Sequence, residues 1–231
     1  MYTRRILSLI LTFGLLTFIV TGCSDDDSPT QPTPQTARIM AIHASPNAPT
    51  VDVLVDDNVA ASNVSFPENT QYLEVAAGTR NVKINVAGTN NTALELPAVP
   101  VLAGSVISVF AIDSVENLNV LALIDDLTPP ASGKSHIRFI HLSPNAPAVD
   151  ITDTQGNVIF EDVSFADEVE GFTPVDAGTY NLQVRLSGTD TVVLELPNIN
   201  LAGGKIYTVF AKGFVGGEGN QALGAQIIVN N

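Results

Sequence analysis

The chain has 231 residues, with 10 Lys and Arg against 24 Asp and Glu, so its net charge is −14 at pH 7. Apolar residues make up 45% of it, which is enough to build a core and excludes an intrinsically disordered chain. Its single cysteine excludes an intrachain disulfide and a cysteine-based zinc site, and the acidic charge argues against nucleic acid as a partner.

The N-terminus reads as an export signal. Arg4 and Arg5 precede residues 6–20, a stretch of 15 residues without a charge. As a helix it would be about 22 Å long, which is short for a bilayer core of about 30 Å and suits a signal peptide. Residues 20–23, Val-Thr-Gly-Cys, then resemble the lipobox of bacterial lipoproteins. The resemblance implies cleavage after residue 22 and a lipid anchor on Cys23; an ordinary secretory signal or an uncleaved anchor are the alternatives.

Residues 23–36 are predicted to form a flexible tether after the lipidated cysteine. The segment is rich in Pro, Thr, Gln and Asp and lacks apolar periodicity. At about 3.1 Å per residue, the part after Cys23 would reach roughly 40 Å. Its acidic run, Asp25 to Asp27, resembles the surface-export signals of some Gram-negative lipoproteins, although a solubilising linker explains it equally well. We therefore expect a lipid-anchored protein of the cell envelope, at the outer membrane or cell surface.

The rest of the chain consists of two copies of one unit. Residues 42–52 return as residues 140–150 at an offset of 98, and residues 94–97, Leu-Glu-Leu-Pro, return as residues 194–197 at an offset of 100. The copies span residues 37–126 and 135–231. Residues 127–134, which contain two consecutive prolines, are predicted to form a semi-rigid hinge between them.

Each copy is predicted to be all-β. Apolar and polar residues alternate through residues 81–86 and 182–187, which places one face of a strand in a core and the other in water. No helical stripe of useful length is present. We expect two tandem Ig-like Greek-key β-sandwich domains after the signal peptide. Further strands are predicted at 38–43, 51–55, 93–96, 106–112, 120–124 and 192–196, with counterparts of the others in the second copy.

A tyrosine corner is predicted near Tyr180, within the sequence Asp-Ala-Gly-Thr-Tyr-Asn-Leu. The first copy has Arg80 at the equivalent position, so the sequence suggests that the unit can dispense with this corner.

The pattern His-x-Ser-Pro-Asn-Ala-Pro-x-Val-Asp occurs twice and is the most specific feature of the repeats. We call each occurrence a repeated block. It resembles a bacterial family of domains of unknown function, number 4397, which implies Ig-like envelope modules and supplies no activity and no catalytic residue. We interpret its residues as structural, with the histidine ring binding the loop backbone. They are His43, Ser45, Pro46, Asn47, Pro49 and Asp52 in the first copy, and His141, Ser143, Pro144, Asn145, Pro147 and Asp150 in the second.

Other roles for these residues remain alternatives. Asp52 and Asp150 alternate with apolar residues and should point outward, where calcium could bind together with Asn47 or Asn145. Residues 56–58, Asp-Asp-Asn, form a second turn rich in oxygen ligands. A hydrolase using His141 and Ser143 is the weakest alternative, because no oxyanion device is visible.

We expect a non-enzymatic envelope protein that acts as a spacer, adhesion module or ligand-presenting scaffold, without a cofactor and without a bound metal. The alternative is a glycan- or matrix-binding surface lipoprotein, assisted by calcium. Its partner would be an envelope protein or a polysaccharide. The lack of tryptophan makes a glycan site built on stacked rings less favoured.

Overall fold

A computed structural model describes residues 35–167 and 171–231, which belong to one compact unit. Within these ranges the chain forms two β-sandwiches without an α-helix, so the predicted all-β fold of two tandem sandwiches is confirmed. No helix in the described ranges is long and apolar enough to cross a membrane. The predicted signal peptide, Cys23 and all but the last two residues of the predicted tether lie outside the described residues.

Eight strands and one short 3-10 helix form the first half. They are β1 (Thr36–His43), β2 (Val51–Val55), β3 (Asn58–Val64), β4 (Leu73–Ala76), β5 (Gly78–Val86), β6 (Thr92–Val101), β7 (Val106–Ile112), η1 (Val115–Asn117) and β8 (Asn119–Ile124).

The second half repeats this order of elements. They are β9 (Lys134–His141), β10 (Val149–Asp153), β11 (Val158–Val163), β12 (Thr173–Asp176), β13 (Gly178–Leu186), β14 (Val192–Leu201), β15 (Ile206–Lys212), η2 (Gly219–Gln221) and β16 (Gly224–Val229).

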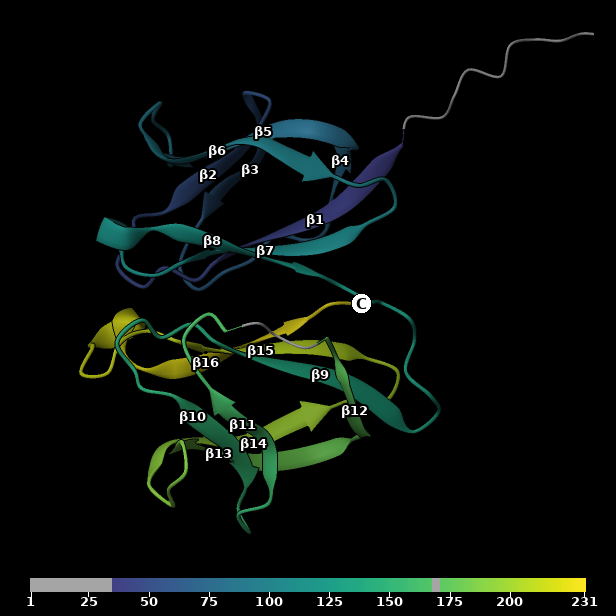
Figure 1. Cartoon of the computed structure of the whole chain (residues 1–231), viewed down its shortest axis with the longest axis vertical. Helices are drawn as coiled ribbons and strands as arrows, with labels where there is room; N and C mark the ends of the chain where they lie inside the picture. Colours follow the sequence, from purple (N-terminus) through teal and green to yellow (C-terminus); the bar gives the residue numbers. More distant parts are fainter. Residues whose placement is uncertain (1–34, 168–170) are drawn as a thin grey trace, which may run out of the picture. The chain divides into compact units, whose positions relative to one another are not determined.

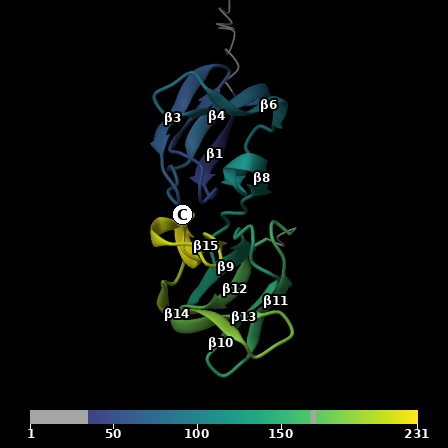
Figure 2. The same cartoon turned by 90° about the vertical axis from the view of Figure 1, so that its left-hand side faces the viewer.

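Each half consists of two four-stranded sheets that lie face to face (Figures 1 and 2). In the first half the strand orders are β4-β1-β7-β8 and β3-β2-β5-β6, and the second half has the same orders eight strands later. All neighbours are antiparallel except β1 with β7 and β9 with β15, which are parallel. The connection from β1 to β2, and from β9 to β10, therefore crosses from one sheet to the other.

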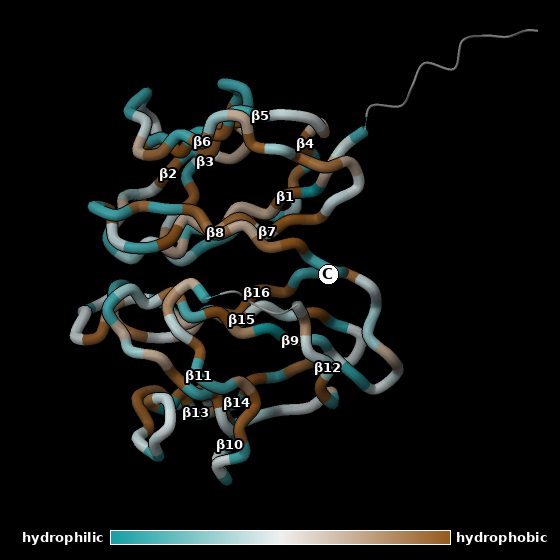
Figure 3. The backbone as a smooth tube through the Cα atoms, viewed as in Figure 1, coloured by the Kyte–Doolittle hydropathy of each residue, from teal (hydrophilic) through white to brown (hydrophobic). Residues whose placement is uncertain are grey.

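The central strands β1, β7, β9 and β15 are rich in apolar residues and are mostly buried on both faces. Residues 106–112 read Val-Ile-Ser-Val-Phe-Ala-Ile, and Figure 3 shows hydrophobic residues concentrated on the strands rather than on the turns. Strands with near-continuous apolar sequences are typical of sheets that are covered on both sides. One face of these strands packs inside its own sandwich, and the other packs against the other half.

Three apolar clusters follow from this arrangement. One lies inside the first half around Val51, Val64 and Ile84, and one inside the second half around Phe139 and Ile151. The third contains residues of both halves and is called the shared cluster here. Its buried members are Met40, Ile42, Ala44, Phe110, Ile112, Ile140, Leu142, Phe210 and Ile228.

Candidate functional site

The two repeated blocks form the loops that leave β1 and β9. His43 is the last residue of β1 and His141 the last residue of β9, and both are 1% exposed. His43 Nε2 lies 2.9 Å from the carbonyl oxygen of Pro49, and His141 Nε2 lies 3.0 Å from that of Pro147. The ring therefore closes the loop by binding its far end, six residues along the chain.

Ser143 and His141 are not arranged as a nucleophile and its base. The backbone N–H of Ser143 donates to His141 Nδ1 at 3.3 Å, so Nε2 carries the proton that binds Pro147. Ser143 Oγ donates to the carbonyl oxygen of Gly213 at 2.7 Å. Both serines of the repeated blocks are fully buried, and Ser45 Oγ has no hydrogen-bond partner among the described residues. Neither Ser45 nor Ser143 therefore has a hydroxyl that is both activated and accessible.

The asparagines of the blocks bind the loops that follow β7 and β15. Asn47 Oδ1 accepts the backbone N–H of Val115 at 2.8 Å, and Asn145 Oδ1 accepts that of Val215 at the same distance. A proline precedes each asparagine and fixes the backbone of the loop, at Pro46 and Pro144. In the first half the loop between β1 and β2 is thus hydrogen-bonded to the loop after β7. In the second half the loop between β9 and β10 is bonded in the same way to the loop after β15.

Asp52 holds a bulge and a turn in the first half. Its Oδ1 accepts the backbone N–H of Asn63 at 2.8 Å, and its Oδ2 accepts that of Gly88 at 2.9 Å. Asn63 has a φ of 56°, at a register shift between β2 and β3. These two backbone donors lower the pKa of the Asp52 carboxyl. Both carboxylate oxygens of Asp52 therefore already accept backbone hydrogen bonds.

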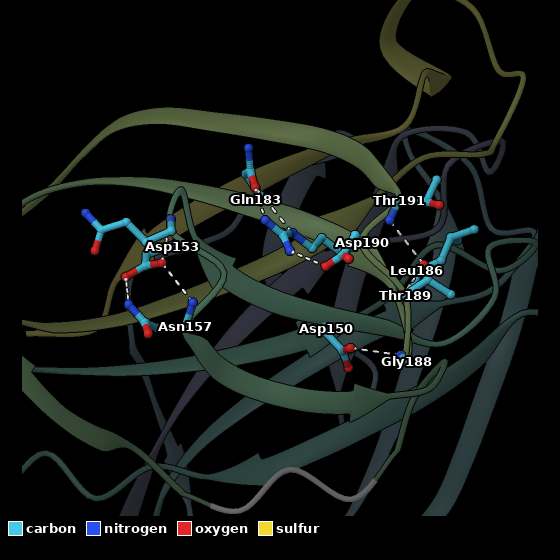
Figure 4. Close-up of polar contacts among 11 residues, drawn as sticks. Asp150, Asp153, Asn157, Gln183, Leu186, Gly188, Thr189, Asp190 and Thr191 are labelled. Carbon is cyan, nitrogen blue, oxygen red and sulfur yellow. Dashed lines mark hydrogen bonds and ion pairs between the residues drawn. The ribbon is translucent and has the colours of Figure 1, made fainter.

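Asp150 plays the same part in the second half (Figure 4). Its oxygens accept the backbone N–H of Asp162 at 2.7 Å and of Gly188 at 2.9 Å. Asp150 is only 7% exposed, so the prediction that it points outward is wrong. The reason is that a carboxylate facing the bulge gains two backbone donors there, which offset the loss of water.

The carboxylates expected to bind calcium do not converge. Asp56 accepts the backbone N–H of Asn81 at 2.9 Å and pairs with Arg80 at 3.0 Å. In the corresponding turn of the second half, Asp153 accepts hydrogen bonds from Asn157 (Figure 4). Among residues 35–167 and 171–231, no three His, Cys, Asp or Glu side chains gather closely enough to hold a metal ion. The geometry gives the calcium alternative no support.

The tyrosine corner is present in the second half, where Tyr180 donates its hydroxyl to the carbonyl oxygen of Asp176 at 2.7 Å. The first half has no tyrosine at this position but keeps an equivalent contact. Arg80 Nε donates to the carbonyl oxygen of Ala76, the residue equivalent to Asp176, also at 2.7 Å. A guanidinium, which carries several donors, replaces the phenol and also reaches Asp56.

The shared cluster joins the two halves through equivalent residues. Phe110 of β7 and its counterpart Phe210 of β15 are both fully buried, and their rings meet edge to face at 5.9 Å between centroids. A contact between equivalent residues is the hallmark of a two-fold interface between identical surfaces. The halves therefore pack like the subunits of a homodimer that are joined in one chain.

A buried ion pair crosses the same interface. Arg138 Nη2 of β9 and Asp125 Oδ1, which follows β8, lie 2.7 Å apart with 1% and 0% of their side chains exposed. This contact is electrostatic rather than an aligned hydrogen bond. Asp125 Oδ2 accepts the hydroxyls of Tyr72 and Ser108, each at 2.6 Å. Burial and the neighbouring Asp125 raise the pKa of Tyr72 to about 12, so its hydroxyl remains a donor.

Hydrogen bonds complete a ring around this ion pair. Arg138 Nε donates to Thr208 Oγ1 at 2.9 Å, and Thr208 donates to Asn230 Oδ1 at 2.8 Å. Asn230 Nδ2 of the second half donates across the interface to the hydroxyl of Tyr72 in the first half, at 3.0 Å. The ring, which we call the interface network, crosses between the halves twice. Buried polar groups of this kind favour one fixed arrangement because every alternative leaves a partner unsatisfied.

Sequence reasoning missed the interface network. The available signal was Arg138 itself, a charge between Ile137 and Phe139 in a strand whose other residues are mostly buried. A charge placed there requires a buried partner. The partner, Asp125, lies beyond the predicted strand 120–124 and showed no pattern of its own.

An apolar pocket of about 420 Å³ adjoins the second repeated block. Its lining includes His141 and Pro147 of the block together with Leu186, Val193 and Val215. Its size falls within the range of small-molecule sites. It offers apolar contact but only one titratable group, His141, whose Nε2 is already bonded to the loop.

The two block histidines should make stability depend on pH. Burial lowers the pKa of His43 and of His141, and the loop carbonyls oppose this only in part. The unfolded chain therefore takes up protons more readily once the pH falls below about 6.5. We expect the Tm to be highest above about pH 7 and to fall as the pH drops from 7 to 5.

The measurement is a series of thermal melts between pH 5 and 8, compared with the double variant His43→Gln/His141→Gln. The variant should be less stable at pH 7 but should lose most of the slope between pH 7 and 5. An equally steep slope in the variant would assign the pH dependence to other groups.

Comparison with known protein families gives one match. Residues 37–152 match the model of a family described as Domain of unknown function (DUF4397). The match covers half of the chain, runs from β1 into β10, and so contains both repeated blocks. No curated protein matches the chain.

Proposed function

The chain belongs to the DUF4397 family, and from this premise we propose that it is a non-enzymatic, lipid-anchored protein of the bacterial cell envelope. Its two sandwiches would act together as one rigid scaffold that carries binding loops away from the membrane. The observation that carries the proposal is the shared cluster with its interface network, which gives the two halves a common buried core.

The repeated blocks support a scaffold rather than a catalyst. Their histidines, asparagines and aspartates bind backbone groups of their own half, at distances between 2.7 and 3.0 Å. Side chains that are occupied in this way stiffen the loops of the sandwich. Rigid frames that present exposed loops are a common basis for binding surfaces.

The buried contacts between the halves favour a fixed spacer over two modules on a swivel. The predicted hinge, residues 127–134, lies between Asp125, which follows β8, and Arg138, which is part of β9, and both residues belong to the interface network. Separating the halves would break the buried ion pair and expose the apolar shared cluster to water, and the exposure of the cluster opposes separation. Flexibility would then reside in the predicted tether, residues 23–36, rather than between the sandwiches.

The anchor can be tested by metabolic labelling with a radioactive or clickable fatty acid in a bacterial host. The wild-type chain should incorporate the label and fractionate with membranes, because the thiol of Cys23 accepts the lipid and several acyl chains hold a protein firmly. Cys23→Ala should incorporate none and should keep its signal peptide, whereas Ser24→Ala should behave like the wild type. Label incorporated into Cys23→Ala would contradict the lipid anchor.

The alternative to this scaffold is a glycan-binding lipoprotein, whose partner would be a polysaccharide. A sugar site of the stacking type needs exposed aromatic rings. The tyrosines of the described ranges already have structural roles: Tyr72 belongs to the interface network, Tyr180 to its corner, and the hydroxyl of Tyr207 accepts the backbone N–H of Ala202. A pull-down of residues 24–231 with envelope polysaccharides tests this alternative, and specific retention would favour it over the scaffold.

A further inference from the structure

The core of the first sandwich contains a cavity of about 200 Å³ between its two sheets. A second space of about 30 Å³ shares several of its lining residues. The lining is apolar throughout and comes from strands of both sheets. The lining residues include Ala41, Val53, Ala60, Val82, Leu96 and Val109.

The second sandwich fills the equivalent space with its own side chains. Ala41 pairs with Val109 in the parallel ladder, and Phe139 pairs with Val209 at the same place in the second half. Ala61 lies opposite Val53, whereas Phe160 lies opposite Ile151. The rings of Phe139 and Phe160 lie 6.2 Å apart. Of these two alanines, Ala41 lines the cavity, and it stands where the second half places the ring of Phe139.

The exposure of the lining residues agrees with this difference. Four residues of the first core are only half-buried, while their counterparts in the second half are between 2% and 6% exposed. The pairs are Ile39 and Ile137, Val53 and Ile151, Val82 and Leu182, and Val109 and Val209. The core of the first sandwich is therefore less tightly filled than that of the second. The residues that line its cavity are all apolar.

We propose that this cavity binds an uncharged ligand of the size of a single aromatic ring. The second half shows that this core accommodates phenyl groups. An apolar cavity of about 150 Å³ in another protein stays dry and takes up benzene, so about 200 Å³ is enough for a ring with a small substituent. The apolar lining excludes charged or strongly polar ligands, because no group is there to replace their water.

The edge strands give the ligand a route into the core. Ala60 of β3 and both Leu73 and Val75 of β4 line the cavity, and β3 and β4 are each at the edge of their sheet. An edge strand is hydrogen-bonded on one side only. Separating β3 from β4 therefore opens the sandwich without breaking a ladder inside either sheet.

Toluene is the probe for this site. We would use the mature chain, residues 23–231, with Cys23→Ala to keep it in water, and record thermal melts over a toluene titration. Binding to the folded state alone should raise the Tm saturably, by about 3–5 °C at about ten times the Kd. The absence of a saturable rise would overturn the proposal.

Filling the cavity provides the decisive comparison. Ala41→Phe, which copies Phe139, should raise the Tm without toluene and abolish the response to it. The matched control Ala93→Phe, at an exposed position of β6, should keep the response. Should Ala41→Phe fail to fold, Ala60→Leu fills the same space from β3. A toluene response that survives cavity filling would place the binding elsewhere and refute the site.

Discussion

Replacing Arg138 with methionine is expected to lower the free energy of unfolding by about 3–5 kcal/mol, because the substitution leaves the Asp125 carboxylate buried without its cation. Asp125 is fully buried and lies 2.7 Å from the guanidinium, so water cannot take the place of the lost charge without opening the interface. Urea denaturation of residues 24–231 measures the loss. For a chain of this size the Tm should fall by roughly 10 °C.

The double variant Arg138→Met/Asp125→Asn is the control for this prediction. Met40 and Asn230 occupy the positions equivalent to Arg138 and Asp125, so the double variant gives both sides of the interface the same pair of residues. It should regain most of the stability, because no buried charge remains. A double variant as unstable as Arg138→Met, or a single variant as stable as the wild type, would show that the ion pair does not govern the interface.

Truncating Phe110 to alanine is the second substitution with a large expected effect. The ring is fully buried in the shared cluster and meets Phe210 edge to face. Removing it should cost about 3–5 kcal/mol, from lost burial and from the cavity that remains. Because the cluster belongs to both halves, the loss should raise amide hydrogen exchange in β7 and also in β15.

Phe160→Ala serves as the matched truncation for Phe110→Ala. Phe160 packs inside the second half against Phe139 and contributes nothing to the shared cluster. Faster exchange should then be confined to the second half. If Phe110→Ala accelerated exchange in the first half alone, the two sandwiches would be independent in stability, contrary to the structure.

The strands that contribute most to the cores were predictable from the sequence. The predicted ranges 51–55 and 106–112 coincide with β2 and β7. The edge strands β3 and β4 were not predicted. β3 reads Asn-Val-Ala-Ala-Ser-Asn-Val, with little β-branched or aromatic character, and β4 has four residues. Such strands form because a neighbour offers an unpaired edge, which local propensity does not encode.

The interface between the halves was not predictable by alternation alone. Apolar and polar residues alternate along β5 and β13, but this period does not describe every strand of the unit. In β7 and β15 the second face carries Phe110 and Phe210, which meet each other instead of solvent. A strand with a continuous apolar sequence indicates that both of its faces are buried. The sequence does not indicate that the second face is buried against the other copy of the repeat.

The structural role of the repeated block was predictable from the sequence, whereas most of the hydrogen-bond partners of its residues were not. A histidine at a strand end before two prolines indicates a ring that binds the loop backbone, and His43 and His141 make such a bond. The partners of Asp52 and Asp150 could not be predicted, because they lie at a bulge and at a turn far along the chain. Long-range register decides both contacts.

The distance distribution between the two sandwiches tests the rigid scaffold most directly. Residues 24–231 contain no cysteine, so spin labels can be placed at Asn90→Cys in the first half and Glu195→Cys in the second, both exposed. Pulsed electron spin resonance should give a single narrow distribution that is unchanged between low and high salt, because the ion pair joining the halves is buried. A broad distribution, like that of two bodies on a flexible linker, would contradict the account.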